Sequence, residues 1–326
     1  MTRVLINGFG RIGRSILRAH LRGRGNLVVA GINDIAPPET CAYLMRWDSV
    51  FGPWPEEVAA EPGALRVGRH RIPFHSTDDL STLDLSDIDL VLECTGHADT
   101  RDEVERGLRA GARRILMSGP STVADATIVI GANDHLLADQ RVVSNASCTT
   151  NAVAPLLKAL DDAFGVETGS MTTIHCYTGS QPTVDTAHGP HLARSRAAAL
   201  SMVPTTTSAG RLVDEVLPHL AGRVPCQSVR VPTASVSAVD LSVMLRAPAT
   251  AAEVDDAILA SPVIGAETDE VVSADMRMRP ESYVHLPAET RVAGSGTRGG
   301  MVRVFGWYDN EWGFACRMLD LAERMA

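Results

Sequence analysis

A glycine-rich turn between a strand and a helix is the feature that most constrains this chain. Residues 7–14 read NGFGRIGR directly after an apolar run at residues 4–6, and apolar residues then recur with a helical period. Gly8 permits a tight turn, Gly10 lets backbone approach a pyrophosphate, and Gly13 lets the helix pack closely on the strand. Because the N-terminus of such a helix favours anions, the pattern predicts a dinucleotide site. Ordinary glycine turns are the alternative.

An acidic residue follows at the position that this interpretation requires. The apolar run at residues 27–32 ends at Asn33 and Asp34, and Asp34 lies 21 residues after Gly13 (34 − 13). A carboxylate there accepts hydrogen bonds from the ribose hydroxyls and repels a 2′-phosphate. We therefore expect the cofactor to be NAD, with some use of NADP left open.

The rest of the first half alternates short apolar runs with a helical segment over residues 100–110. The runs lie at residues 88–92, 114–117 and 127–130. Continuous apolar strands alternating with helices predict a parallel sheet that is covered on both faces. Thr95, Gly96 and Ser118 follow strand ends, at the carboxyl edge where such sheets bind ligands.

A cysteine stands at a second boundary between a strand and a helix. Residues 144–151 read SNASCTTN, and an apolar helix is predicted over residues 152–164. The residues expected to cap this helix are Thr149, Thr150 and Asn151. A helix N-terminus stabilises a thiolate, so we expect Cys148 to have a lowered pKa and to act as a nucleophile. A structural cysteine beside a capping threonine is the alternative.

The second half contains strand-like runs with few helices between them, which predicts a mixed or antiparallel sheet. The runs lie at residues 171–177, 228–233, 236–246 and 302–307, helices are expected at 209–220 and 310–325, and a polar loop spans 179–196. We therefore expect an α/β protein with a Rossmann-type NAD-binding domain over residues 1–147, completed by a C-terminal helix at 311–326. An α+β catalytic domain is expected over residues 148–310.

His175 is the candidate base for the thiol. It lies 27 residues beyond Cys148 (175 − 148), inside an apolar strand and beside polar loop residues. A thiol nucleophile requires a proton acceptor, and histidine suits neutral pH. A structural role for this histidine is the alternative.

Composition excludes several other classes of protein. The net charge of −9 argues against a general nucleic-acid binder, and no apolar stretch approaches the roughly 20 residues that span a bilayer. The six cysteines are scattered without metal-ligand spacing, so neither a metal site nor disulfides are expected. With no signal-peptide pattern at the N-terminus, we expect a reduced, cytoplasmic protein.

Two further motifs complete a resemblance to a known family. Residues 230–233 read RVPT and residues 307–313 read WYDNEWG. With the glycine motif and the cysteine motif, they make the chain similar over nearly its full length to glyceraldehyde-3-phosphate dehydrogenase. Erythrose-4-phosphate dehydrogenase is a close sister with the same motifs.

The resemblance implies a role for each matching residue. Cys148 would be the nucleophile and His175 its base. The cofactor would be contacted by Arg11, Ile12, Asp34, Ser118 and Asn310. Inorganic phosphate would be held by Ser147, Thr149, Arg194, Thr207 and Ser208, and the substrate phosphate by Thr178, Ser180 and Arg230. The resemblance also implies a homotetramer, a place in glycolysis, and a phosphorylated aldehyde and inorganic phosphate as substrates.

Departures from the family pattern leave alternatives open. Ser208 replaces the usual glycine, and Thr186-Ala187 replaces a pair typical of strictly NAD-using members. The resemblance therefore implies glyceraldehyde 3-phosphate as the substrate or, alternatively, erythrose 4-phosphate or another phosphorylated aldehyde. Phosphorolysis or hydrolysis could release the product. A non-catalytic NAD-bound sensor is the third hypothesis, against which the intact cysteine and histidine argue.

Overall fold

A computed structural model describes residues 1–187, 189, 191–294 and 299–326 of the chain, so His188 and Pro190 of the predicted polar loop lie outside the described residues. These residues form two compact units. The first comprises Met1–Ile128, His135–Ala146 and Phe314–Ala326, and the second comprises Val129–Asp134 and Ser147–Gly313.

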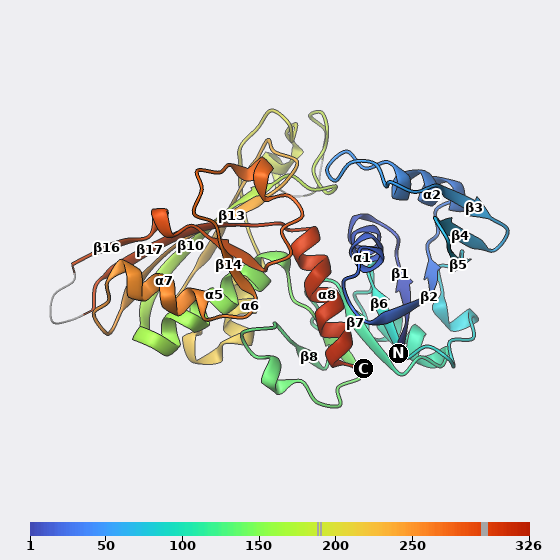
Figure 1. Ribbon diagram of the computed structural model, residues 1–326, viewed down its shortest axis with the longest axis horizontal. Helices are drawn as coiled ribbons and strands as arrows, with labels where there is room; N and C mark the ends of the chain where they lie inside the picture. Colours follow the sequence, from blue (N-terminus) through green and yellow to red (C-terminus); the bar gives the residue numbers. More distant parts are fainter. Residues whose placement is uncertain (188, 190, 295–298) are drawn as a thin grey trace. The chain divides into compact units, whose positions relative to one another are not determined.

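The first unit is built on a sheet with the strand order β3-β4-β5-β2-β1-β6-β7-β9-β8 (Figure 1). Its strands are Thr2–Asn7 (β1), Leu27–Asn33 (β2), Val58–Glu61 (β3), Ala64–Val67 (β4), His70–His75 (β5), Leu90–Glu93 (β6), Arg114–Met117 (β7), Ala126–Thr127 (β8) and Val142–Ser144 (β9). Its helices are Arg11–Leu21 (α1), Pro38–Arg46 (α2), Arg101–Val104 (α3), Arg106–Arg109 (α4) and most of Trp312–Arg324 (α8). Along this order, each pair of neighbouring strands from β5 through β2, β1, β6, β7 and β9 to β8 is parallel. This confirms the predicted Rossmann-type sheet.

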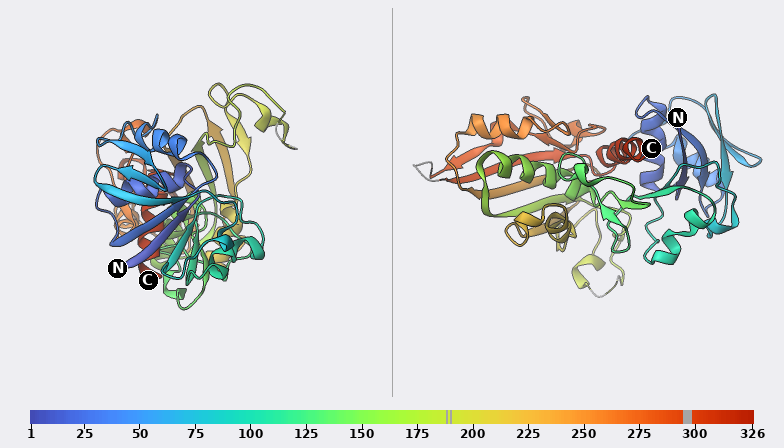
Figure 2. Two further views of the ribbon diagram at one scale, coloured as in Figure 1. Left: turned by 90° about the vertical axis from the view of Figure 1, so that its right-hand side faces the viewer. Right: turned by 90° about the horizontal axis from the view of Figure 1, so that it is seen from below.

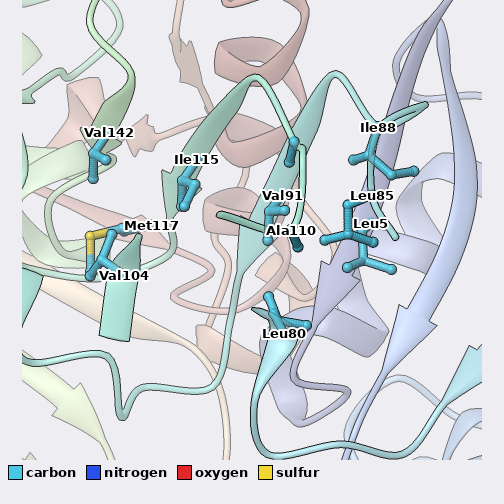
Figure 3. Packing of buried hydrophobic residues seen from close by; sticks show 11 residues of the cluster. Leu5, Leu80, Leu85, Ile88, Val91, Val104, Ala110, Ile115, Met117 and Val142 are labelled. Atoms are coloured by element: carbon cyan, nitrogen blue, oxygen red, sulfur yellow. The ribbon is translucent and has the colours of Figure 1, made fainter. Parts of the chain in front are cut away.

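Apolar side chains from the central strands pack against α3 and the segment before β6. Figure 3 shows Leu5, Val91 and Ile115 from three neighbouring strands beside Leu80 and Leu85. All of them are buried, because strands in a parallel sheet are covered on both faces. Because β2, β1 and β6 are parallel neighbours in the sheet, their carboxyl ends lie at one edge.

Local differences from the expected elements have physical reasons. The run at residues 127–130 forms strand only at β8, because the Val129 N–H donates to the Asn133 side chain and Gly131 turns the chain with a positive φ. The helix expected over residues 100–110 is interrupted at Glu105, between α3 and α4. The antiparallel β3-β4-β5 strands were not predicted, because their apolar runs are short and broken by charged residues.

The second unit carries a sheet with the order β11-β12-β10-β13-β17-β15-β14, and β16 pairs with β17. Its strands are Val166–Cys176 (β10), Val203–Thr205 (β11), Cys226–Val231 (β12), Ser237–Leu245 (β13), Ile264–Ala266 (β14), Tyr283–His285 (β15), Arg291–Ala293 (β16) and Met301–Tyr308 (β17). Its helices are Cys148–Phe164 (α5), Ala209–Val216 (α6) and Ala251–Leu259 (α7). Parallel and antiparallel pairs occur together, which confirms the predicted mixed sheet.

Helix α5 lies between α6 and α7 and packs on β10 and β13 (Figures 1 and 2). It begins at Cys148, four residues earlier than predicted, and Ser147 is its N-cap. The Ser147 hydroxyl accepts the Thr150 N–H at 3.1 Å, so the predicted caps at Thr149, Thr150 and Asn151 are wrong. These three residues instead form the first turn, and Cys148 is the first helical residue.

We expect Ser147→Ala to destabilise the protein by about 1 kcal/mol, because the Thr150 N–H loses its acceptor. Ser147→Thr keeps a hydroxyl at the cap and should recover most of this loss. Thermal and urea unfolding of both variants measure the effect. Equal stability of Ser147→Ala and the wild-type protein would show that Ser147 does not cap α5.

Candidate active site and cofactor pocket

A cavity of about 360 Å³ opens at the carboxyl edge of the sheet in the first unit. Its lining includes four residues predicted to bind the cofactor, which are Gly8, Gly10, Asp34 and Thr95. Residues that were not predicted also line it, including Asn7, Asn33, Thr77, Asp78, Glu93 and Arg106. The cavity therefore lies where ligands bind in doubly wound sheets.

The glycines have the geometry that a dinucleotide requires. Gly8 has a φ of +90°, and a Cβ there would lie 2.6 Å from the Thr95 nitrogen. A Cβ at Gly13 would lie 2.1 Å from the Gly8 oxygen, so Gly13 allows α1 to pack against the turn. A Cβ at Gly10 would meet nothing within 4 Å, so this position leaves open space beside the N-terminus of α1. The cavity and the turn fit a bound dinucleotide.

Asp34 presents a fixed carboxylate to this cavity. One carboxylate oxygen accepts the Phe9 N–H at 2.5 Å and the other accepts the Ala36 N–H at 2.8 Å. These two backbone donors hold the side chain at the end of β2. The carboxylate is thus placed where it can accept ribose hydroxyls and repel a 2′-phosphate.

Other predicted cofactor residues do not line the cavity. They are Arg11, Ile12, Gly13, Gly96 and Ser118. The Arg11 side chain pairs with Asp48 and stacks 5.2 Å from the centre of the Phe51 ring. Asn310, the last of the predicted set, belongs to the second unit.

A polar network at the strand ends was not predicted. The Asn33 side chain donates to Asn7 at 2.7 Å, and Asn7 donates to the Glu93 carboxylate, which also accepts from Thr95. Each of Asn7, Asn33 and Glu93 is a buried polar residue that ends a strand directly after apolar residues. That position is a signal which could have identified them from the sequence.

In the second unit, the structure brings the predicted nucleophile and base together. The Cys148 sulfur lies 3.8 Å from His175 Nε2. His175 Nδ1 lies 2.7 Å from the Cys176 carbonyl oxygen, and because a carbonyl only accepts, Nδ1 carries the proton. The unprotonated Nε2 therefore faces the thiol, as a proton acceptor must.

The electrostatics of the pair differ from the expectation. Burial raises the pKa of the Cys148 thiol and outweighs the opposing effects of Thr149, Arg230 and the backbone, so the expected lowering is wrong. Burial and the Arg230 charge lower the pKa of His175 to about 4, although the Cys176 carbonyl opposes this shift. The resting pair is thus a neutral thiol beside a neutral imidazole.

Arg230 joins this pair to two hydroxyl side chains. Its Nη1 lies 3.1 Å from His175 Nδ1, and it donates to the Cys176 carbonyl at 3.0 Å and to Thr178 at 3.4 Å. The hydroxyls of Thr178 and Ser180 are 3.0 Å apart. A guanidinium and two hydroxyls therefore lie next to the imidazole, which is a suitable arrangement for a phosphate group.

The residues predicted to hold a second anion lie in two places. Arg194 donates to the Thr205 and Thr206 hydroxyls at 2.6 and 2.9 Å. Thr207 accepts the Ala209 N–H at 3.1 Å, and Ser208 is the N-cap of α6. Ser147 and Thr149 lie at the start of α5. None of the contacts between described residues joins Arg194 to Cys148, so a shared anion site remains a prediction.

Two residues that were not predicted orient Asn310. The Cys176 thiol and the Ser237 hydroxyl both donate to the Asn310 side-chain oxygen at 3.1 Å. Tyr308 was also missed as a site residue, although it lies in a recognised motif. Its hydroxyl contacts Thr149 and Thr173.

Searches for other kinds of site over the described parts of the chain gave two further findings. They contain no group of three or more His, Cys, Asp or Glu side chains that could hold a metal ion. No described helix combines the length and the apolar character needed to cross a membrane.

Comparisons with known proteins define the class. Residues 2–101 match the family description "Glyceraldehyde 3-phosphate dehydrogenase, NAD binding domain", and residues 147–310 match "Glyceraldehyde 3-phosphate dehydrogenase, C-terminal domain". The chain is 45% identical to a glyceraldehyde-3-phosphate dehydrogenase of Xanthobacter flavus, 46% to one of Cereibacter sphaeroides and 43% to one of Pseudomonas aeruginosa. Each comparison covers 99% of this chain and 98% of the relative.

Fold, cavity and comparisons together define an NAD-dependent dehydrogenase. The chain belongs to the glyceraldehyde-3-phosphate dehydrogenase family, as the sequence resemblance indicated. Its cofactor is NAD. When bound, NAD supplies a hydride acceptor, and Gly8, Gly10 and Asp34 are the residues of the cavity best placed to hold it.

We predict that Asp34 determines the preference for NAD over NADP. Asp34→Asn keeps the size of the side chain but removes the charge that repels a 2′-phosphate. The ratio of kcat/KM for NAD to that for NADP should fall by about tenfold or more. Asp78→Asn removes another carboxylate of the same cavity and should change the ratio less. A wild-type preference for NADP, or an unchanged ratio in Asp34→Asn, would contradict this role.

We predict that His175 accepts the thiol proton across the neutral pH range. Because its pKa is lowered to about 4, the imidazole is unprotonated above that value, and alkylation of Cys148 by iodoacetamide should slow on acidification towards it. His175→Asn should reduce alkylation at pH 7 by at least about tenfold. His219→Asn, at an exposed histidine paired with Asp161, is the matched control. A rate that is unaffected by His175→Asn would exclude proton transfer between the pair.

Proposed function

We propose that this enzyme oxidises glyceraldehyde 3-phosphate to 1,3-bisphosphoglycerate through a thioester on Cys148. The observation that carries the proposal is the thiol 3.8 Å from an unprotonated Nε2, with Arg230 alongside. The names of the relatives support the substrate, because those proteins are glyceraldehyde-3-phosphate dehydrogenases. Thr178, Ser180 and Arg230 would bind the phosphate of the aldehyde.

The groups of this chain account for every proton in the first half of the reaction. His175 Nε2 takes the proton of the Cys148 thiol, and the sulfur adds to the aldehyde carbon, forming a C–S bond. The imidazolium then protonates the resulting oxyanion, which gives a hemithioacetal and restores the neutral base. The backbone N–H of Cys148, at the start of α5, would stabilise the oxyanion.

Oxidation and release complete the cycle. As the carbon gives up a hydride, His175 removes the hydroxyl proton and the thioester forms. Inorganic phosphate then attacks the acyl carbon, the C–S bond breaks, and the imidazolium returns its proton to Cys148. Ser147, Thr149, Arg194, Thr207 and Ser208 would hold that phosphate, and positioning alone can contribute several kcal/mol over a loosely held water.

The organisation of the protein follows the same proposal. Residues 1–147 with 311–326 would serve as the NAD-binding domain and residues 148–310 as the catalytic domain, with Asn310 contacting the cofactor. Several exposed apolar side chains on the segment that includes the polar loop support a homotetramer, in which this segment meets a neighbouring subunit. They are Val184, Leu192, Leu200 and Met202. All six cysteines, each within the described residues, are free, which supports a cytoplasmic enzyme. A place in glycolysis follows from the proposed reaction.

NADH formation from a panel of aldehydes, each with and without inorganic phosphate, tests this function. We expect turnover of glyceraldehyde 3-phosphate to require phosphate, and Cys148→Ser to abolish turnover while NAD binding is kept. Cys226→Ser changes a half-buried cysteine on β12 and is the matched control.

Each other outcome identifies a different function. Faster turnover of erythrose 4-phosphate would assign the chain to the sister activity. A rate that is independent of phosphate, with a free acid as product, would identify hydrolysis. Absence of turnover with every aldehyde, with NAD binding intact, would indicate a sensor.

A further inference from the structure

The hydroxyl of Tyr308 contacts two threonine hydroxyls, one next to the nucleophile in the sequence and one two residues from the base. It lies 2.9 Å from Thr149 Oγ1 and 2.7 Å from Thr173 Oγ1. Thr149 follows Cys148 in the first turn of α5. Thr173 lies two residues before His175 on β10, so both side chains are on the same face of the sheet. Tyr308 therefore contacts the element that carries the nucleophile and the element that carries the base.

The ring of Tyr308 also packs against the base itself. Its centroid lies 6.0 Å from that of the His175 ring, and the two planes meet at 81° in an edge-to-face arrangement. Burial raises the pKa of Tyr308, so its hydroxyl is protonated at neutral pH. The side chain can thus hold groups in place through its ring and its hydroxyl.

The geometry of the α5–β10 pair explains why such a link matters. Gly165 joins the end of the helix to the start of the strand. Cys148 lies at the other end of the helix, and His175 lies near the other end of the strand. With 17 residues at 1.5 Å each, α5 separates that connection from the thiol by roughly 25 Å. A small rotation of the helix about Gly165 would therefore change the distance between the sulfur and Nε2 substantially.

We propose that Tyr308 is a positioning residue that fixes the distance between the Cys148 sulfur and His175 Nε2. It does so by tying the first turn of α5 to the end of β10 through the two threonine hydroxyls. The catalytic consequence rests on the proposed function, because it assumes that the pair transfers a proton. The positioning itself can be measured without any substrate.

Tyr308→Phe is the direct test, because it keeps the ring against His175 and removes only the hydroxyl. We expect the pH profile for iodoacetamide alkylation of Cys148 in the full-length protein to shift to higher pH. Since small misplacements of reacting groups cost up to about a hundredfold, we expect kcat to fall by about tenfold with little change in the aldehyde KM.

Two further variants separate positioning from general destabilisation. Thr173→Val breaks the same link from the side of β10, at a fully buried residue whose hydroxyl lies 2.7 Å from that of Tyr308. It should shift the profile in the same direction, and the double variant should be no worse than Tyr308→Phe. Tyr283→Phe removes a hydroxyl from another fully buried tyrosine of the same sheet, whose hydroxyl has no hydrogen-bond partner among the described residues. It should leave the profile unchanged.

Three results would overturn the positioning role. They are an unchanged alkylation profile in Tyr308→Phe, an equal shift in Tyr283→Phe, and additive effects of Tyr308→Phe and Thr173→Val. A melting temperature lowered in Tyr308→Phe without a change in the profile would also show a merely structural role. Failure of the wild-type enzyme to oxidise any phosphorylated aldehyde would instead refute the proposed function, because alkylation requires neither aldehyde nor phosphate.

Discussion

The contact between the Cys148 sulfur and His175 Nε2 depends on where α5 begins. Ser147 accepts the Thr150 N–H and so ends the preceding extended segment at one residue. As a result, the thiol occupies the first helical position and points to the end of β10. A start at residue 152, as the apolar pattern alone indicated, would have left the cysteine in a loop with no fixed relation to the base.

Burial shifts the pKa values of the two members of this pair in opposite directions. It disfavours a thiolate on Cys148 and an imidazolium on His175, so the charge-separated state is costly before substrate arrives. The partial positive charge of the helix N-terminus and the charge of Arg230 both favour the thiolate of Cys148 and so oppose the effect of burial on it. A neutral resting pair still suits the chemistry, because the proton needs to move only when the aldehyde carbon accepts the sulfur.

Much of the framework could be predicted because it depends on local rules. The turn at Gly8, the carboxylate at Asp34 and the mixed second sheet all follow from spacing and periodicity within a few tens of residues. The cap of α5 was misplaced because Ser147, Thr149 and Thr150 are all good capping residues, and only the backbone conformation distinguishes them. The side chain of Arg11 pairs with Asp48, 37 residues away, and local pattern does not specify this partner.

Tyr308 illustrates the part of the site that sequence reasoning cannot reach. Its hydroxyl bonds to residues 159 and 135 positions earlier in the chain, and nothing in the WYDNEWG motif indicates which groups it meets. The antiparallel pairing of β10, β13 and β17 brings these positions together. Once the Tyr308 hydroxyl is buried, its two threonine partners stabilise it, because a buried polar group without a partner costs about 1–3 kcal/mol. The hydrogen bonds that satisfy the buried Tyr308 hydroxyl are therefore the same ones that, in our proposal, fix the distance between the thiol and its base.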